Sequence, residues 1–169
     1  MGVWCESVER LWDPSDMSSA GGKTDGGLRI LLREYLPDGD WVSVETGATA
    51  AGVPDSNFCF SPGLEGWVEG KRATGWQVAF QPGQIGWHAR RSRRGGRTFV
   101  AVRQMLRASD ALFVVRGSDL EEWSRLGHPN RKGQIVCPLK SWDKCFVTAG
   151  GPARWDWARV RSIFCSQNM

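Results

Sequence analysis

The chain has 169 residues, of which 41% are hydrophobic and 24% are charged, and its formal net charge is +4. These values are typical of one soluble globular domain. No apolar run approaches the length that crosses a bilayer, and the first ten residues lack the apolar core of a signal peptide. Five cysteines, an odd number without a Cys-x-x-Cys spacing, favour reduced thiols in a cytoplasm over a disulfide framework.

The first third of the chain predicts a polar segment followed by one helix and three strands. Residues 1–25 are rich in Ser, Gly and Asp after Trp12, which indicates a flexible loop before a single domain over 26–169. Apolar residues at helical spacing predict a helix over 27–36. β-forming residues predict strands over 41–46, 55–60 and 64–72, the last two joined by the turn SPG.

The rest of the chain predicts a second helix and further strands. The pattern over 75–81 is ambiguous, and a helix is expected over 82–94 between a proline and two glycines. Strands over 97–103 and 110–117 complete an α-β-β-β-α-β order with one strand more. This order predicts an α/β fold with a mixed central sheet flanked by helices. Residues 118–169 form a C-terminal extension with helices over 118–127 and 153–164 and a strand over 133–139.

Three charged residues fall on the hairpin expected from the second and third strands. Glu69 and Lys71 are two apart and therefore project from one face of a strand. If the two strands pair through the SPG turn, Asp55 comes within reach of the same ion as Glu69. Two carboxylates and a lysine suit metal-assisted phosphodiester hydrolysis, because Mg²⁺ and Mn²⁺ prefer oxygen ligands and a lysine stabilises developing negative charge. Taken singly, Asp55 also fits a turn, and Glu69 with Lys71 also fits an exposed pair on an edge strand.

A basic block follows this hairpin. From Gly70 to Ser109 the chain has no Asp or Glu but nine Lys and Arg residues. Such a block favours a polyanionic partner, nucleic acid above all, although a solvated face is the alternative. Most of the ten tryptophans are expected in the core, with one or two near the block able to stack on bases. A zinc site from His128, Cys137 and Cys145 is a weaker possibility, since its spacing matches no standard pattern.

The motifs Pro54-Asp55 and Glu69-Gly70-Lys71, together with the α-β-β-β-α-β order, resemble the PD-(D/E)xK nucleases with a restriction-endonuclease-like core. The stretches GVPDS, GWVEGKR and QPGQIGWHARRSRRGGRTFVAV resemble the virus-type replication-repair nuclease (VRR-NUC) domain and the related Holliday junction resolvases, over roughly residues 25–117. Members carry a glutamine early in the helix after the lysine strand, which corresponds to Gln84, with Gln81 as the alternative. They often carry a glutamate on the first helix, which corresponds to Glu34; Glu45 and Glu65 are alternatives.

The resemblance implies a Mg²⁺- or Mn²⁺-dependent, structure-selective DNA endonuclease, similar to a Holliday junction resolvase in recombination or replication. It implies a catalytic set of Asp55, Glu69, Lys71 and Gln84, and metal ligands Asp55, Glu69 and Glu34. It also implies DNA contacts from the basic residues Arg72, Arg90, Arg91, Arg93, Arg94 and Arg97. A cytoplasmic homodimer acting on branched DNA is expected. The alternatives are a nicking, flap or restriction-type nuclease, a catalytically inactive DNA-binding module, and an RNA-processing nuclease.

Overall fold

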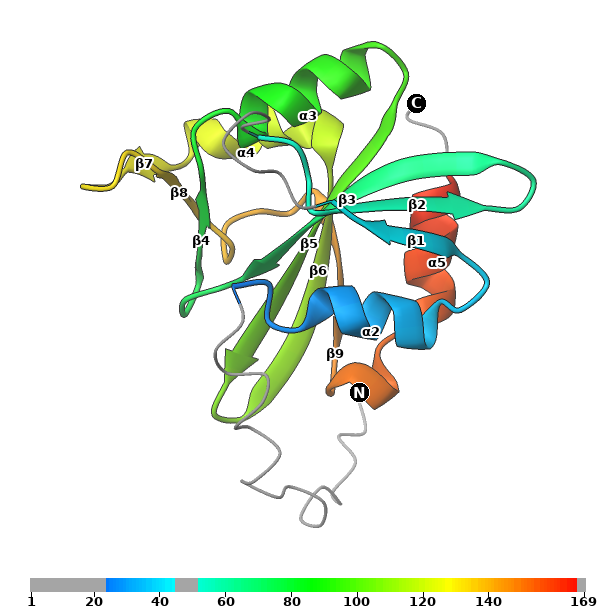
Figure 1. The fold of residues 1–169 in the computed structure, drawn as a ribbon. Coiled ribbons are helices and arrows are strands. Elements are labelled where there is room, and N and C mark those ends of the chain that lie inside the picture. The colour runs from blue at the N-terminus through cyan, green and yellow to red at the C-terminus, as the bar shows by residue number, and fades with distance from the viewer. Residues whose placement is uncertain (1–23, 45–51, 167–169) are drawn as a thin grey trace.

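The computed structural model describes residues 24–44 and 52–166. Its largest element is a six-stranded sheet in the order β1-β2-β3-β5-β6-β9 (Figure 1). The strands are β1 (Asp40–Ser43), β2 (Ser56–Phe60), β3 (Leu64–Arg72), β5 (Arg97–Leu106), β6 (Ser109–Arg116) and β9 (Cys145–Ala149). The α-helices of the described residues are α2 (Leu28–Tyr35), α3 (Gln84–Arg93), α4 (Leu120–Arg125) and α5 (Trp157–Cys165). The 3-10 helices η2 (Gly117–Asp119) and η3 (Pro152–Arg154) precede α4 and α5.

The sheet is mixed, as the sequence predicts. β3 and β5 are parallel, and all other neighbouring pairs in this sheet are antiparallel. Parallel neighbours need a crossover connection, and here that connection contains α3. It also contains β4 (Gln77–Phe80), which leaves the large sheet and pairs with β8 (Ile135–Pro138). β8 in turn pairs with β7 (His128–Pro129) to complete a three-stranded sheet.

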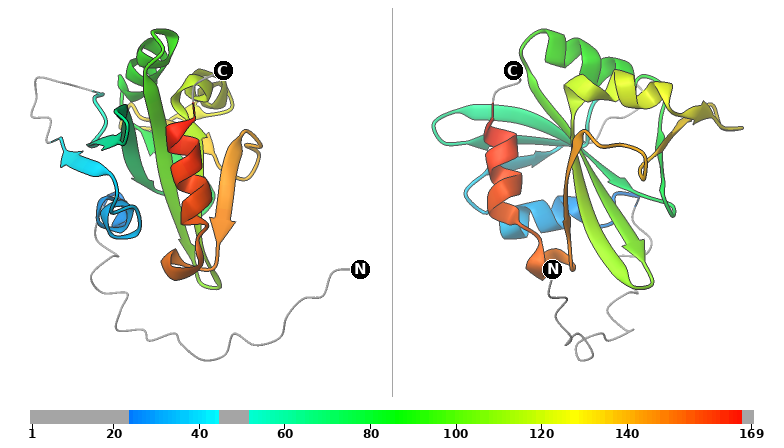
Figure 2. Two further views of the ribbon diagram at one scale, coloured as in Figure 1. Left: turned by 90° about the vertical axis from the view of Figure 1, so that its right-hand side faces the viewer. Right: turned by 180° about the vertical axis from the view of Figure 1, so that it is seen from behind.

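Two hydrophobic clusters cover the two faces of the large sheet. Along β5, Phe99 and Ala101 belong to one cluster, and Val100 and Val102 belong to the other. A strand buried on both faces reads as a continuous apolar run, which explains the sequence of β5. The first cluster is completed by α2 and α5, and Figure 2 shows α5 lying along the long strands β5 and β6. The second cluster is completed by α4 and the small sheet.

The predicted helices over 27–36, 82–94 and 153–164 are confirmed within a few residues, and the strand over 64–72 is found with these bounds. The ambiguous stretch 75–81 contains β4, and β9 was not predicted. Residues 1–23 of the expected flexible segment lie outside the described residues, whereas Asp25, assigned to that segment, is buried. Within the described part of the chain, no helix is long and apolar enough to cross a membrane.

Candidate functional site

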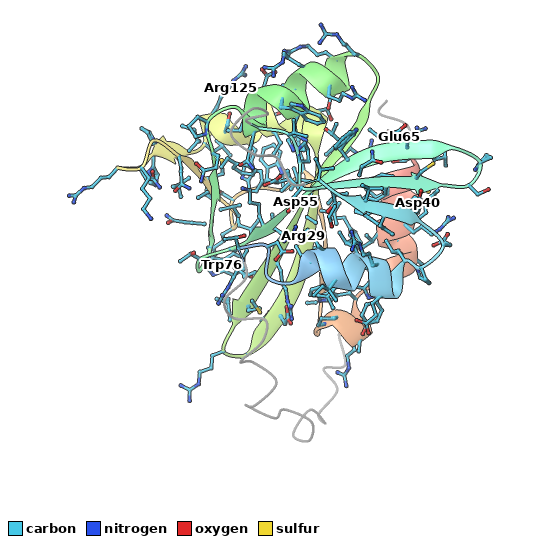
Figure 3. The ribbon with its side chains drawn as sticks, in the orientation of Figure 1. Arg29, Asp40, Asp55, Glu65, Trp76 and Arg125 are labelled. Atoms are coloured by element: carbon cyan, nitrogen blue, oxygen red, sulfur yellow. The ribbon has the colours of Figure 1, made fainter. Side chains whose placement is uncertain are left out.

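The hairpin of β2 and β3 places the two predicted acids opposite each other. Its antiparallel register pairs Ser56 with Val68, so the residue before Ser56 lies opposite the residue after Val68. These residues are Asp55, which directly precedes β2, and Glu69, whose negative charge is close enough to raise the pKa of Asp55. The Gly70 backbone N–H donates a hydrogen bond of 3.3 Å to Asp55 Oδ1, which ties the end of β2 to β3. Figure 3 labels Asp55 near the middle of the molecule, where the strands converge.

Glu69, Lys71 and Gln84 form one hydrogen-bonded cluster between β3 and the start of α3. Lys71 Nζ lies 3.0 Å from Glu69 Oε1 and donates to Gln84 Oε1 at 2.9 Å. The Gln84 amide in turn donates from Nε2 to Glu69 Oε1, and its Oε1 also accepts from the Gln81 backbone N–H. Glu69 is only 5% exposed, so its carboxylate is buried beside the ammonium group of Lys71. The structure thus brings the Gln84 side chain to the site, whereas Gln81 contributes its backbone and is exposed.

The position of Asp55 raises its pKa. Burial, followed by the negative charge of Glu69, raises the pKa of Asp55 from 3.8 to about 6, against the hydrogen bonds from Gly70 and Ser56 and the charge of Arg29. Burial disfavours the ionised carboxylate, and a second carboxylate nearby disfavours it further. A divalent cation between the two acids would offset both effects.

One oxygen of each acid is left for such a cation. The hydrogen bonds from Gly70 and Ser56 go to Asp55 Oδ1, the Gln84 amide donates to Glu69 Oε1, and Lys71 forms its ion pair with that same oxygen. Among the described residues no donor reaches Asp55 Oδ2 or Glu69 Oε2, and hard divalent cations take carboxylate oxygens together with several waters. The described residues contain no group of three or more His, Cys, Asp or Glu side chains that could hold a metal ion. The carboxylates of Asp55 and Glu69, with water, are therefore the ligands that the described part of the chain could offer a cation, and the possible set of His128, Cys137 and Cys145 does not form a zinc site.

The acid near the site is Asp25, which precedes the first helix, rather than Glu34. Glu34 is exposed in the last turn of α2, whereas the beginning of α2 is the end that approaches β3. A Cβ on Gly70 would lie 3.1 Å from Asp25 Cβ and 3.4 Å from Asp55 Oδ2, so both acids press against this glycine. The Asp25 carboxylate accepts from backbone N–H groups at the start of α2, those of Gly27 and residue 29. The sequence signal for it is an acid placed three residues before the helix, at a helix N-terminus where carboxylates are favoured.

The other two glutamates considered for this role are also away from the cluster. Glu45 lies outside the described residues. Glu65 is exposed on β3, accepts a hydrogen bond from Asn57, and is labelled in Figure 3 along the hairpin from Asp55.

The predicted basic residues are divided among different surroundings. Arg90 and Arg91 are exposed on α3, Arg94 is exposed at its C-cap, and all three line a common pocket with Trp87. Arg93 points elsewhere and forms an ion pair of 2.9 Å with Glu121. The remaining two are Arg72, exposed at the end of β3, and Arg97, which is partly buried at the start of β5. The basic block is therefore not one continuous face.

A buried histidine lies behind the cluster. His88 is one helical turn after Gln84 on α3 and is completely buried. Neither ring nitrogen has a hydrogen-bond partner among the described residues. Burial, and secondarily the positive charge of Lys71, lowers the pKa of His88 from 6.5 to about 3, so the ring is neutral at ordinary pH. Sequence reasoning gave this residue no role.

No protein-family model matches the chain, and no curated protein matches it significantly.

Proposed function

We propose that this protein is a metal-dependent nuclease that hydrolyses phosphodiester bonds in DNA, with a PD-(D/E)xK arrangement on a restriction-endonuclease-like core. The observation that carries the proposal is the cluster of Glu69, Lys71 and Gln84 facing Asp55 at the end of the hairpin. Buried charges are costly unless they have a partner or a task, and the pKa of Asp55 is raised in a way typical of functional sites.

Each residue of the site has a distinct task in this proposal. Asp55 Oδ2 and Glu69 Oε2 would hold Mg²⁺ or Mn²⁺, which when bound lowers the pKa of a coordinated water and offsets charge on the phosphoryl oxygens. The Lys71 ammonium has three N–H donors; it donates to Gln84 and forms an ion pair with Glu69. Its remaining donor capacity would orient the attacking water or stabilise the charge that develops on the phosphoryl group. Gln84 holds both partners, since its amide donates to the acid and accepts from the lysine.

The proposed substrate is DNA because arginines gather on α3, which begins at the site. Contacts from arginines to phosphates position a duplex without reading its sequence. Junction-selective cleavage by a homodimer, as in Holliday junction resolvases, is the form of the activity that we propose first. The alternatives are nicking, flap or restriction-type cleavage of DNA, and cleavage of RNA. They use the same chemistry as junction cleavage and differ from it in the substrate that is cut.

The test is cleavage of end-labelled four-way junction, flap, linear duplex and single-stranded RNA in Mg²⁺, Mn²⁺ or EDTA. We expect metal-dependent cleavage by the wild type and none by Glu69→Ala. Glu65→Ala is the matched control, because it removes an exposed carboxylate from the same strand and should cleave as the wild type does. Cleavage that persists in EDTA or in Glu69→Ala would refute the proposed site, and equal cutting of junction and duplex would refute junction selectivity alone.

A second candidate is a DNA-binding module without catalysis. One observation favours it: in the described part of the chain no three His, Cys, Asp or Glu side chains come together in a group that could hold a metal ion. Titration calorimetry with Mn²⁺ separates the candidates. The nuclease requires Mn²⁺ binding that is lost in Asp55→Asn, whereas the binding module takes up DNA and shows no heat with Mn²⁺.

A further inference from the structure

A pocket on the solvent side of α3 combines an aromatic ring with three arginines. Its volume is about 330 Å³, and it is lined by Trp87, Arg90, Arg91 and Arg94. These residues follow one another at i, i+3, i+4 and i+7, so helical geometry puts them on one face. The other face of α3 carries the buried residues Gln84, His88 and Ala89. The pocket therefore lies on the face of α3 that does not pack against the core.

Trp87 is held in place from the sheet side. Its ring packs edge to face against Trp67, with 5.5 Å between the ring centroids. Trp67 is on β3 two residues before Glu69, and both point to the face that α3 covers. The two contacts from β3 to α3, Trp67 to Trp87 and Glu69 to Gln84, fix the helix against the strand. The pocket and the proposed catalytic cluster are thus parts of one rigid pair of elements.

No carboxylate of residues 24–44 or 52–166 pairs with the arginines of the pocket. Arg93, which lies between these arginines in the sequence, pairs instead with Glu121. Like charges three and four apart on a helix repel each other, so the group weakens α3 unless an anion binds. The position near the helix C-terminus favours positive charge. It does not explain why a tryptophan is left partly exposed among the arginines.

The chemistry of the pocket is that of nucleotide recognition. The Arg91 guanidinium lies over the Trp87 ring, 6.0 Å from its centroid, so the flat face of the indole is turned to the arginines. Tryptophan faces and guanidinium planes are the groups on which unpaired bases stack, and arginines bind phosphates. A base inside a duplex is already stacked on its neighbours and cannot use such a face.

We propose that this pocket binds one unpaired nucleotide of the substrate, with its base against Trp87 and its flanking phosphates on Arg90, Arg91 and Arg94. The inference rests on the proposed function and deepens it. Trp87 is three residues after Gln84, about 5 Å along the axis of α3, so the unpaired nucleotide would bind to the outer face of the helix that contributes Gln84 to the site. The preferred substrate is then DNA with a single-stranded segment beside the cut, such as a flap or an opened branch point, rather than a continuous duplex.

The test measures binding in EDTA, where metal-dependent cleavage cannot occur. The probes are single-stranded oligothymidylate and oligouridylate carrying one 2-aminopurine, and a duplex of the same length. We expect the full-length wild type to quench 2-aminopurine in the single strand and to bind it more tightly than Trp87→Leu by about tenfold, the size of one base–aromatic stack. Duplex binding should change by less than about twofold. The DNA and RNA arms show whether the nucleotide sugar matters.

Matched variants distinguish base stacking on Trp87 and phosphate binding by the arginines from the general effect of losing a tryptophan or a positive charge. Trp76→Leu removes another tryptophan, 43% exposed and outside the pocket, and should bind as the wild type does. Arg94→Gln should weaken binding of both single strand and duplex, and Arg93→Gln, with the same change of charge on the same helix, should weaken it much less. Thermal unfolding checks that each variant is folded, and the quenching by the wild type needs no variant at all. Absence of quenching, or equal binding by Trp87→Leu and Trp76→Leu, would overturn the pocket.

The result for the nucleotide pocket can be told apart from the result for nuclease activity. Cleavage without any effect of Trp87→Leu leaves the nuclease standing and removes the pocket. Single-strand binding through Trp87 without cleavage of any substrate keeps the pocket and removes the nuclease.

Discussion

Replacing Asp55 by Asn should stabilise the metal-free protein in a strongly pH-dependent manner. In the folded protein the pKa of Asp55 is raised from 3.8 to about 6, chiefly by burial and next by Glu69. Between these two values the folded state binds more protons than the unfolded state, so stability is lost as the pH rises through the window. Asn keeps the oxygen that accepts from Gly70 and Ser56 but does not titrate.

The magnitude follows from the two pKa values. At about 1.4 kcal/mol per pKa unit, the ionisation of Asp55 costs the folded state about 3 kcal/mol at neutral pH. We therefore expect the free energy of unfolding of Asp55→Asn, relative to wild type, to rise by about 3 kcal/mol between pH 3.5 and 7.5. About half of that rise should fall above pH 5.

Urea denaturation in EDTA across this pH range measures the difference. Asp40→Asn is the control, because it makes the same chemical change at an exposed residue at the start of β1 (Figure 3). A second series at saturating Mg²⁺ or Mn²⁺ tests the site itself. At a concentration of 100 times Kd the cation should stabilise wild type by about 2.7 kcal/mol and should leave Asp55→Asn unchanged.

Two results would refute this reasoning. If the difference in free energy of unfolding between wild type and Asp55→Asn is the same at all pH values, the pKa of Asp55 is not raised in the folded protein. If the metal stabilises both proteins equally, the cation binds elsewhere.

Two further predictions concern buried polar groups around the site. His88→Leu should be at least as stable as wild type at pH 7, because it removes a buried ring without hydrogen-bond partners. Burial and the charge of Lys71 lower the pKa of His88 to about 3 in the folded protein, so at pH 4.5 only the unfolded ring is protonated. The free energy of unfolding of wild type should therefore fall by about 2.5 kcal/mol between pH 7 and 4.5 because of this residue, and His88→Leu should lack this loss. Urea denaturation at the two pH values measures both effects, and an equal acid loss in His88→Leu would contradict them. Arg103→Met should cost about 3 kcal/mol in the same assay at pH 7, because Arg103 pairs in the interior with Asp110 at 2.6 Å and donates to the Gly26 carbonyl beside the site. The corresponding change at the exposed Arg161 should cost less than about 1 kcal/mol, and equal costs would show that the Arg103 pair contributes nothing special.

The facing acids of the site could be anticipated from the sequence because their geometry is local. A three-residue turn between two strands sets their register, and the register places Asp55 opposite Glu69. The two-residue period of a strand puts Lys71 on the same face as Glu69. Neither step needs knowledge of residues far away in the chain. The role of Gln84 came only from the family resemblance, and its hydrogen bond to Glu69 is seen in the tertiary structure.

Other features depend on contacts between distant segments, and no local pattern encodes them. The choice of Asp25 over Glu34 depends on which end of α2 lies against Gly70. The difference between Arg93 and its neighbours depends on where α4 brings Glu121. The position of the Trp87 ring depends on its edge-to-face contact with Trp67 of β3.

The sequence by itself determined most of the helices and strands, although not β4 or β9, because the spacing of apolar residues and the turn residues act within a few positions of each other. Only the tertiary structure decided that β4 leaves the large sheet and that β9 joins its far edge. It also decided that α5 completes the core under α2, where Trp157 stacks on Tyr35 at 4.8 Å. Pairing and packing are settled by the burial of whole faces against one another, and that free energy belongs to the assembled layers rather than to any single stretch of chain.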